Sequence, residues 1–245
     1  MAVSPASILV PGVLFVATLI RSSLGFGEAL VAVPLLALLI PINVAAPVAV
    51  LASITVALIV VVQDWRKIHF GSAARLVLPT LLGIPLGLVV LRAGAEPVVK
   101  GILAAVIIAF SAYSLTSGKH RQLKDDRFAW LFGLSAGVLG GAYGMNGPPL
   151  ALYGSLRGWS PQHFRATLQG YFLPASLAGL CGYWLAGLWT PAVSRFYLLS
   201  LPLVVIATFL GRGINARIGA PKFLRYVHGG LLAIGAILLS QAVIS

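Results

Sequence analysis

The sequence predicts an all-α polytopic membrane protein made of two inverted repeats of about five helical segments each, with short broken helices at the repeat interface. Its mean hydropathy is +1.00, and only 9% of its residues are charged, whereas soluble domains average about 25%. Glycines interrupt two of its apolar runs at corresponding places in the two halves, a pattern typical of transporters built from repeats. Basic residues collect in the gaps between apolar runs, as the topology of a multi-pass membrane protein requires.

We expect ten apolar segments. They lie at about 6–23, 28–40, 44–62, 76–92, 98–115, 128–142, 146–156, 167–187, 191–210 and 224–243. Segments 28–40 and 146–156 are too short to cross about 30 Å of hydrocarbon at about 1.5 Å per residue. They are interpreted as half-helices or strongly tilted short helices, either re-entrant or spanning. The chain is then a single domain over 1–245, with repeat 1 at about 6–115, a basic linker at 116–127 and repeat 2 at about 128–243.

The basic residues test this arrangement. If the ten segments alternate in direction, 14 of the 17 Lys and Arg residues, including Arg21, fall on one side of the membrane. The positive-inside rule makes that side cytoplasmic and places both termini outside. The net charge of +12 is therefore explained by membrane topology. We expect the protein to lie in a lipid bilayer and not to bind nucleic acid. A homodimer is compatible with the sequence.

Two alignments relate the halves. Pro34 matches Pro149 at an offset of 115, and Arg75 matches Arg195 at an offset of 120, so one small insertion is needed between them. An odd number of segments per half makes the second half enter from the opposite side. Chance alignment is the alternative, because Leu, Ala and Gly are abundant; the charge asymmetry and the matching glycine breaks favour inverted repeats.

The first break reads GFGEALVAVPLL over residues 25–36. Gly25 and Gly27, on either side of Phe26, permit unusual dihedral angles and close approach to the backbone. A half-helix that begins here would direct unpaired N–H groups and the positive end of its dipole into a cavity. This suits an anion. We find no arginine placed in a membrane core, so backbone groups at Gly25, Phe26 and Gly27 are expected to bind it.

Glu28 is the one acidic residue well inside an apolar segment. A carboxylate at membrane depth is costly by about 2.5–3.5 kcal/mol, which makes it a functional candidate. Because burial disfavours the charged form, Glu28 could carry a coupling proton. The alternative is a structural carboxylate that caps the N–H groups of its own half-helix.

The second break, GGAYGMNGPPLALYG over 140–154, has too many glycines and prolines for a regular helix. Gly144 and Gly147 supply backbone donors, and Tyr143 and Asn146 add a hydroxyl and an amide. Asn146 could bind the substrate or tie down the broken chain. Gln169 and Tyr171, near the start of the next span, could also reach the cavity.

Other chemistry has little support in the sequence. The four histidines form no metal-ligand cluster, and neither a Walker loop nor a serine–histidine–acid constellation is evident. We therefore expect no metal, no cofactor and no enzymatic activity.

These motifs resemble the TauE/SafE family of sulfite-exporter-like transporters, also called the toluenesulfonate uptake permease family. The resemblance rests on the Gly-x-Gly stretch ending in Pro34 and Leu35, on residues 140–154, and on FRATLQGYFLP at 164–174. It covers essentially the whole chain. It implies a secondary carrier in the bacterial inner membrane that moves small sulfur-containing anions, such as sulfite, sulfonates or sulfoacetate, often outward.

The leading hypothesis is a secondary active transporter of small anions that works by alternating access, with Glu28 as the proton-coupling candidate. The alternatives are an anion channel and a transporter of another small organic anion. A subunit that delivers substrate to a soluble partner would also carry basic loops, although topology alone accounts for them.

Overall fold

The computed structural model consists of helices and connecting loops over the residues it describes, which confirms the all-α class. Those residues are 5–24, 27–64, 70–116, 123, 126–159, 161–215, 231–240 and 242–243. The labelled helices are α1 (Pro5–Leu24), α2 (Glu28–Ala37), α3 (Ile42–Asp64), α4 (Phe70–Ala93), α5 (Glu96–Thr116), α6 (Ala129–Tyr143), α7 (Gly147–Leu156), α8 (Pro161–Leu185) and α9 (Pro191–Asn215). A further helix covers Leu231–Ser240. Each of the ten predicted apolar segments overlaps one of these helices.

The two short segments are short helices. Helices α1, α3, α4, α5 and α9 are long and apolar enough to cross a membrane. In contrast, α2 and α7 have 10 residues each, or about 15 Å at about 1.5 Å per residue. Protein encloses α2, since eight of its residues are buried. This enclosure is what a helix end inside a bilayer needs, because lipid cannot bond free backbone groups.

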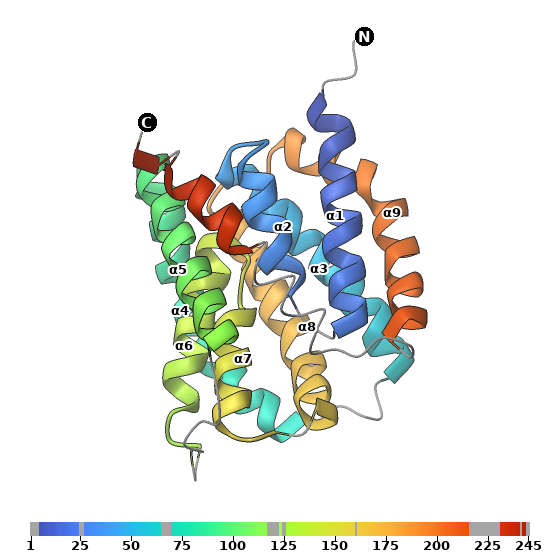
Figure 1. Cartoon of the computed structure of the whole chain (residues 1–245), viewed down its shortest axis with the longest axis vertical. Coiled ribbons are helices and arrows are strands. Elements are labelled where there is room, and N and C mark those ends of the chain that lie inside the picture. Colours follow the sequence, from blue (N-terminus) through green and yellow to red (C-terminus); the bar gives the residue numbers. More distant parts are fainter. Residues whose placement is uncertain are drawn as a thin grey trace.

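Two close helix pairs frame the molecule. In Figure 1, α1 lies beside α9 at one edge, α4 and α6 lie at the other, and α3 and α8 run between them. Gly83 and Gly87 of α4 face Gly137 and Gly141 of α6, and a Cβ added to any of these four would overlap the partner helix. Small residues four apart let membrane helices approach closely. The glycines thus make α4 and α6 one tightly packed unit.

The helix pairing is reciprocal between the halves. Helix α1 packs on α9 as α6 packs on α4, and α3 packs on α9 as α8 packs on α4. The short helices α2 and α7 begin at Glu28 and Gly147, 119 positions apart. Helices α3 and α8 begin at Ile42 and Pro161, also 119 apart.

This spacing differs from the offset of 115 that aligned Pro34 with Pro149. Pro34 is the seventh residue of α2, whereas Pro149 is the third residue of α7. Proline is tolerated in the first turn of a helix because the N–H groups there have no partner within the helix. The two prolines therefore occupy different helical positions, and the helix starts give the better correspondence.

Candidate functional site

Both breaks depend on a glycine in the left-handed region. Gly27 precedes α2 with φ 98° and ψ 0°, and Gly144 follows α6 with φ 66° and ψ 17°. At the second break the N–H of Gly144 donates to Gly140 O (2.8 Å) and that of Met145 donates to Leu139 O (3.1 Å). The Gly144 bond is the 5→1 bond of an αL cap, which terminates a helix while satisfying one of its last carbonyl groups. The chain can thus stop α6 inside the protein and start α7 three residues later.

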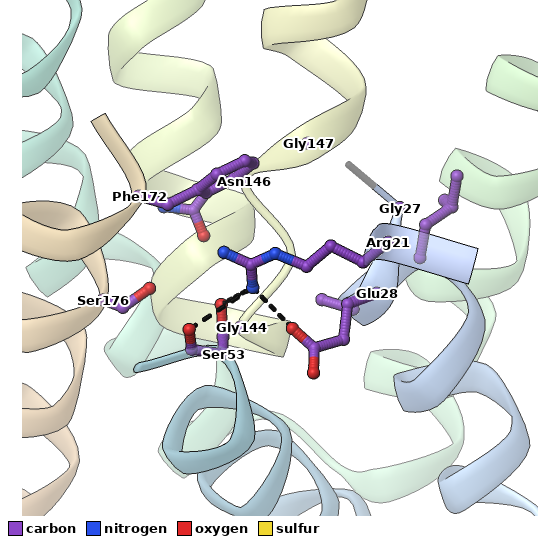
Figure 2. Close-up of a pocket in the computed structure, with 11 residues that line it drawn as sticks. Arg21, Gly27, Glu28, Ser53, Gly144, Asn146, Gly147, Phe172 and Ser176 are labelled. Atoms are coloured by element: carbon purple, nitrogen blue, oxygen red, sulfur yellow. Dashed lines mark hydrogen bonds and ion pairs between the residues drawn. The ribbon is translucent and has the colours of Figure 1, made fainter. Parts of the chain in front are cut away.

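The two breaks line one pocket of about 390 Å³, counting the space at its open side. Its walls come from the end of α1, the start of α2, the middle of α3, the α6–α7 junction and α8. The lining residues are Arg21, Gly27, Glu28, Ala29, Leu30, Ser53, Gly144, Asn146, Gly147, Phe172 and Ser176. Figure 2 shows the labelled members of this group around the Arg21 side chain.

The starts of both short helices lie at the pocket. The first intrahelical bond of α2 runs from Val31 N to Gly27 O, so the N–H groups of Glu28, Ala29 and Leu30 have no partner within the helix. All three residues line the pocket. Helix α7 begins with Gly147 and continues with two prolines, which have no N–H. The positive ends of two helix dipoles meet here, an arrangement that favours negative charge.

Arg21 corrects the sequence interpretation. The sequence assigns it to the basic loops and predicts no arginine in the membrane core, yet Arg21 is only 5% exposed and lines the pocket. Its Nη1 donates to Glu28 Oε2 (2.5 Å), Ser53 Oγ (2.6 Å) and Ser53 O (3.3 Å). The guanidinium carbon lies 4.9 Å from the centre of the Phe172 ring, a cation–π distance. The pocket therefore combines a buried cation with backbone N–H groups.

Glu28 is 2% exposed and is held by side chains of α1. Thr18 Oγ1 donates to its Oε1 (2.9 Å), and Arg21 donates to its Oε2. These contacts cross the first break and tie the start of α2 to the last turns of α1. Because both carboxylate oxygens have side-chain partners, these contacts differ from the predicted alternative, in which Glu28 caps its own helix.

A second group of polar side chains positions Asn146. The Thr80 hydroxyl lies 2.8 Å from both Leu76 O and Gly133 O, to which it can donate. The Tyr171 hydroxyl, 2.8 Å from Thr80 Oγ1, then donates to that oxygen and accepts from Asn146 Nδ2 (3.2 Å). This order directs the amide nitrogen of Asn146 toward Tyr171 and leaves its carbonyl oxygen for the pocket.

The predicted site residues divide into three groups. The structure brings Gly27, Glu28, Gly144, Asn146 and Gly147 together at the pocket. Gly25 and Phe26 lie outside the described residues, as does the side chain of Gln169, whose backbone belongs to α8. Tyr143 is 1% exposed and donates to Val99 O (2.9 Å), and it is not among the lining residues.

Six lining residues were missed by sequence reasoning: Arg21, Ala29, Leu30, Ser53, Phe172 and Ser176. One signal was available for Arg21. It lies seven positions before Glu28, and a buried carboxylate in a membrane segment needs a counter-ion. Ser53, Phe172 and Ser176 sit in apolar runs without a pattern that separates them from core or lipid-facing residues.

Known proteins match the chain along most of its length. The family described as Sulfite exporter TauE/SafE matches residues 10–239. The "Probable sulfite/organosulfonate exporter TauE" of Cupriavidus necator is 30% identical over 183 residues, which cover 74% of this chain and 70% of that protein. No solved structure matches the chain. With its apolar helices and this match over nearly all its residues, the chain belongs to the Sulfite exporter TauE/SafE family of membrane transporters.

Proposed function

We propose that this protein is a secondary active transporter of small sulfur-containing anions, of the sulfite, sulfonate or sulfoacetate type, in the bacterial inner membrane. Membership of an exporter family and the relative's name supply the substrate class. The observation that carries the proposal is the pocket shared by the two breaks, where two helix starts and Arg21 offer positive charge. Small oxyanions suit such a site because their oxygens accept several hydrogen bonds at once.

Transport follows alternating access between two inverted repeats. The reciprocal helix pairs and the equal spacing of α2 from α7 and of α3 from α8 support this arrangement. A site at the repeat interface opens to either side when one repeat rocks against the other. The tight α4–α6 pair would move as one body in such a motion.

Glu28 is the proton-coupling residue in this proposal. It is the acidic residue among the described lining of the pocket, and it contacts Arg21 directly. A carboxyl group beside an anion site can link the occupancy of the site to proton binding, since both change the local charge.

Counterflow in liposomes tests the function. Purified protein is reconstituted in vesicles loaded with unlabelled sulfite, and labelled sulfite is added outside. We expect transient accumulation of label inside, saturation with concentration, and competition by sulfonates. Flux that neither saturates nor shows counterflow would identify an anion channel instead. If a panel of sulfite, sulfonates and sulfoacetate gives no flux above empty vesicles under either pH gradient, the proposed function is wrong.

A further inference from the structure

Of the two terminal nitrogens of the Arg21 guanidinium, only one makes hydrogen bonds to described residues. Its Nη1 is bonded to Glu28 and Ser53. Its Nη2 is buried and has no hydrogen-bond partner among the described residues. A buried N–H donor without an acceptor costs free energy, more so when the group is charged. The pocket therefore lacks an acceptor at Nη2.

Figure 2 shows where this acceptor would sit. The terminal nitrogen without dashed lines points away from Glu28, toward the side of the pocket where Asn146 and Ser176 lie. Gly147, which follows Asn146 in the chain and is the first residue of α7, also lines the pocket. An oxyanion placed there would accept from Nη2 and lie close to the positive end of the α7 dipole.

We propose that Arg21 is the ligand of the transported anion and that the anion binds together with a proton on Glu28. This inference rests on the proposed function and adds the charge balance of the same site. As the anion enters, the Glu28 carboxylate accepts one H⁺ from water, and both leave together on the other side. No other bond forms or breaks.

Charge neutrality is the reason for this linkage. Among the described lining residues, Arg21 and Glu28 alone are ionisable, and they pair with each other across the first break. A bound monoanion would leave one uncompensated negative charge at membrane depth, where burial is costly. A proton on Glu28 removes that excess. Ser53 keeps the guanidinium in place when the carboxylate becomes neutral, because its Oγ and O both accept from Nη1.

The neighbouring titratable groups do not supply this charge. Tyr171, Tyr143 and Tyr183 surround the second break, and their hydroxyls are bonded to Thr80, Val99 O and Gly140 O respectively. Phenols remain neutral near neutral pH. Helices α1, α2, α3, α6, α7 and α8 surround the pocket. Within the described part of the chain, the acidic or basic side chains that they bring to it are Arg21 and Glu28. Transport is then electroneutral, and its direction follows the combined gradients of anion and proton.

Calorimetry on the full-length protein measures the linkage without any mutation. Methanesulfonate is the probe, because it stays a monoanion from mildly acidic to mildly alkaline pH, whereas sulfite titrates near neutrality. Titrations in buffers of different protonation enthalpy give the protons taken up per anion. We expect about one proton per anion at alkaline pH, with affinity falling up to about tenfold per pH unit. Binding without proton uptake and with constant affinity overturns the inference.

Variants assign the proton and the anion to their residues. Glu28→Gln should bind methanesulfonate with an affinity that is independent of pH, and should lose accumulation driven by a pH gradient while keeping counterflow. The neutral pair Arg21→Gln/Glu28→Gln should bind at least about 100-fold more weakly than Glu28→Gln alone. Glu96→Gln removes a half-exposed carboxylate at the start of α5 and should leave proton uptake unchanged.

Failure of the proton linkage can be distinguished from failure of the proposed transport function. Saturable sulfite counterflow combined with proton-free methanesulfonate binding overturns the linkage and leaves the transporter proposal standing. Absence of both binding and counterflow overturns both. If Glu28→Gln does not fold, the calorimetry of the parent protein still decides the question.

Discussion

The two breaks occupy corresponding places in the chain but differ in chemistry. The first carries a buried ion pair, Arg21–Glu28, and three backbone N–H groups at the start of α2. The second carries no charged residue among its described lining members and offers Gly147 followed by two prolines. The same backbone device, a glycine in the left-handed region beside a short helix, thus serves a charged site on one side and a neutral one on the other.

This difference separates two tasks. We propose that charge recognition belongs to α1 and α2, which carry Arg21 and Glu28. In the same proposal, orientation of the anion belongs to the α6–α7 junction, where hydrogen bonds with Tyr171, and through it with Thr80, fix the amide of Asn146. If the tasks are separate, substitutions at the first break should alter the proton uptake and the pH dependence of anion binding. Substitutions at the second break should alter only the affinity for the anion or the packing of the protein.

The largest effect is expected at the ion pair. Arg21→Gln leaves the Glu28 carboxylate buried without a counter-ion, so the protein should lose about 3–5 kcal/mol of stability at neutral pH. Adding Glu28→Gln should recover most of this loss. Thermal unfolding of the purified variants checks both. Equal stability of Arg21→Gln and the parent protein would show that the pair contributes nothing to the first break.

The left-handed glycines at the two breaks differ in the space around them. A Cβ at Gly144 (φ +66°) would lie 2.7 Å from Val50 Cγ2, whereas at Gly27 (φ +98°) no described atom lies within 4 Å. Gly144→Ala should therefore cost backbone strain plus overlap, about 2–4 kcal/mol, and Gly27→Ala about 1–2 kcal/mol of strain alone. Denaturation of the two variants side by side measures the difference. The reverse ranking would mean that the first break is the more tightly packed.

Asn146 should matter for affinity and not for charge. Asn146→Ala removes a pocket amide, and we expect about tenfold weaker methanesulfonate binding with unchanged proton uptake. Tyr171→Phe, which only frees the amide to rotate, should have a smaller effect in the same direction. Calorimetry gives both quantities. Altered proton uptake in either variant would contradict the separation of tasks.

The smallest effect is expected far from the pocket, at the other end of α7. Asp126 accepts from Tyr153 Oη (2.7 Å), pairs with Arg157 Nε (3.0 Å) and contacts Arg75. The Tyr153 hydrogen bond, the largest favourable influence, together with both arginines holds the pKa of Asp126 below its ordinary value despite burial. Because the pKa is lower in the folded state, the ionised Asp126 stabilises the protein when the pH is above the ordinary pKa of Asp. This stability is lost as the pH falls through the folded-state pKa.

Asp126→Asn should accordingly destabilise the protein at neutral pH by at most about 1 kcal/mol, because Arg75 is largely exposed. The difference from the parent protein should vanish in strong acid. Unfolding curves across pH measure it, with Glu96→Gln as the control for loss of a surface carboxylate. A difference that grows in acid would contradict this assignment.

Much of the fold was predictable because the membrane imposes simple rules. Hydropathy located every described helix, and length alone marked α2 and α7 as too short to cross. The glycine breaks identified Gly27, Gly144 and Gly147 as pocket residues. Each of these signals is local in sequence and depends on backbone geometry. This explains why the helices and the glycine breaks can be predicted from the sequence alone.

Arg21 was not predictable by the same rules. The positive-inside rule assigns an arginine near a helix end to the loop, but α1 continues to Leu24 and α2 packs against it. The side chain then lies inside the protein. Glu28 is the signal in the sequence that points to Arg21, because a carboxylate at this depth requires a cation within reach.

Tyr143 was predicted to bind substrate but does not line the pocket. Its position at the second break favoured a substrate contact, yet its hydroxyl bonds Val99 O at the start of α5. Side-chain direction at a helix end depends on which neighbour supplies an acceptor, and that neighbour is distant in sequence.

The central claim is that both breaks hold one anion between them, with Arg21 as its charged ligand. Crystals grown with selenite, a pyramidal oxyanion like sulfite, test it through the anomalous signal of selenium. The account predicts one peak in the pocket, within about 4 Å of Arg21 Nη2 and beside Gly147. A peak outside the pocket, or none at a concentration that inhibits sulfite counterflow, would contradict it.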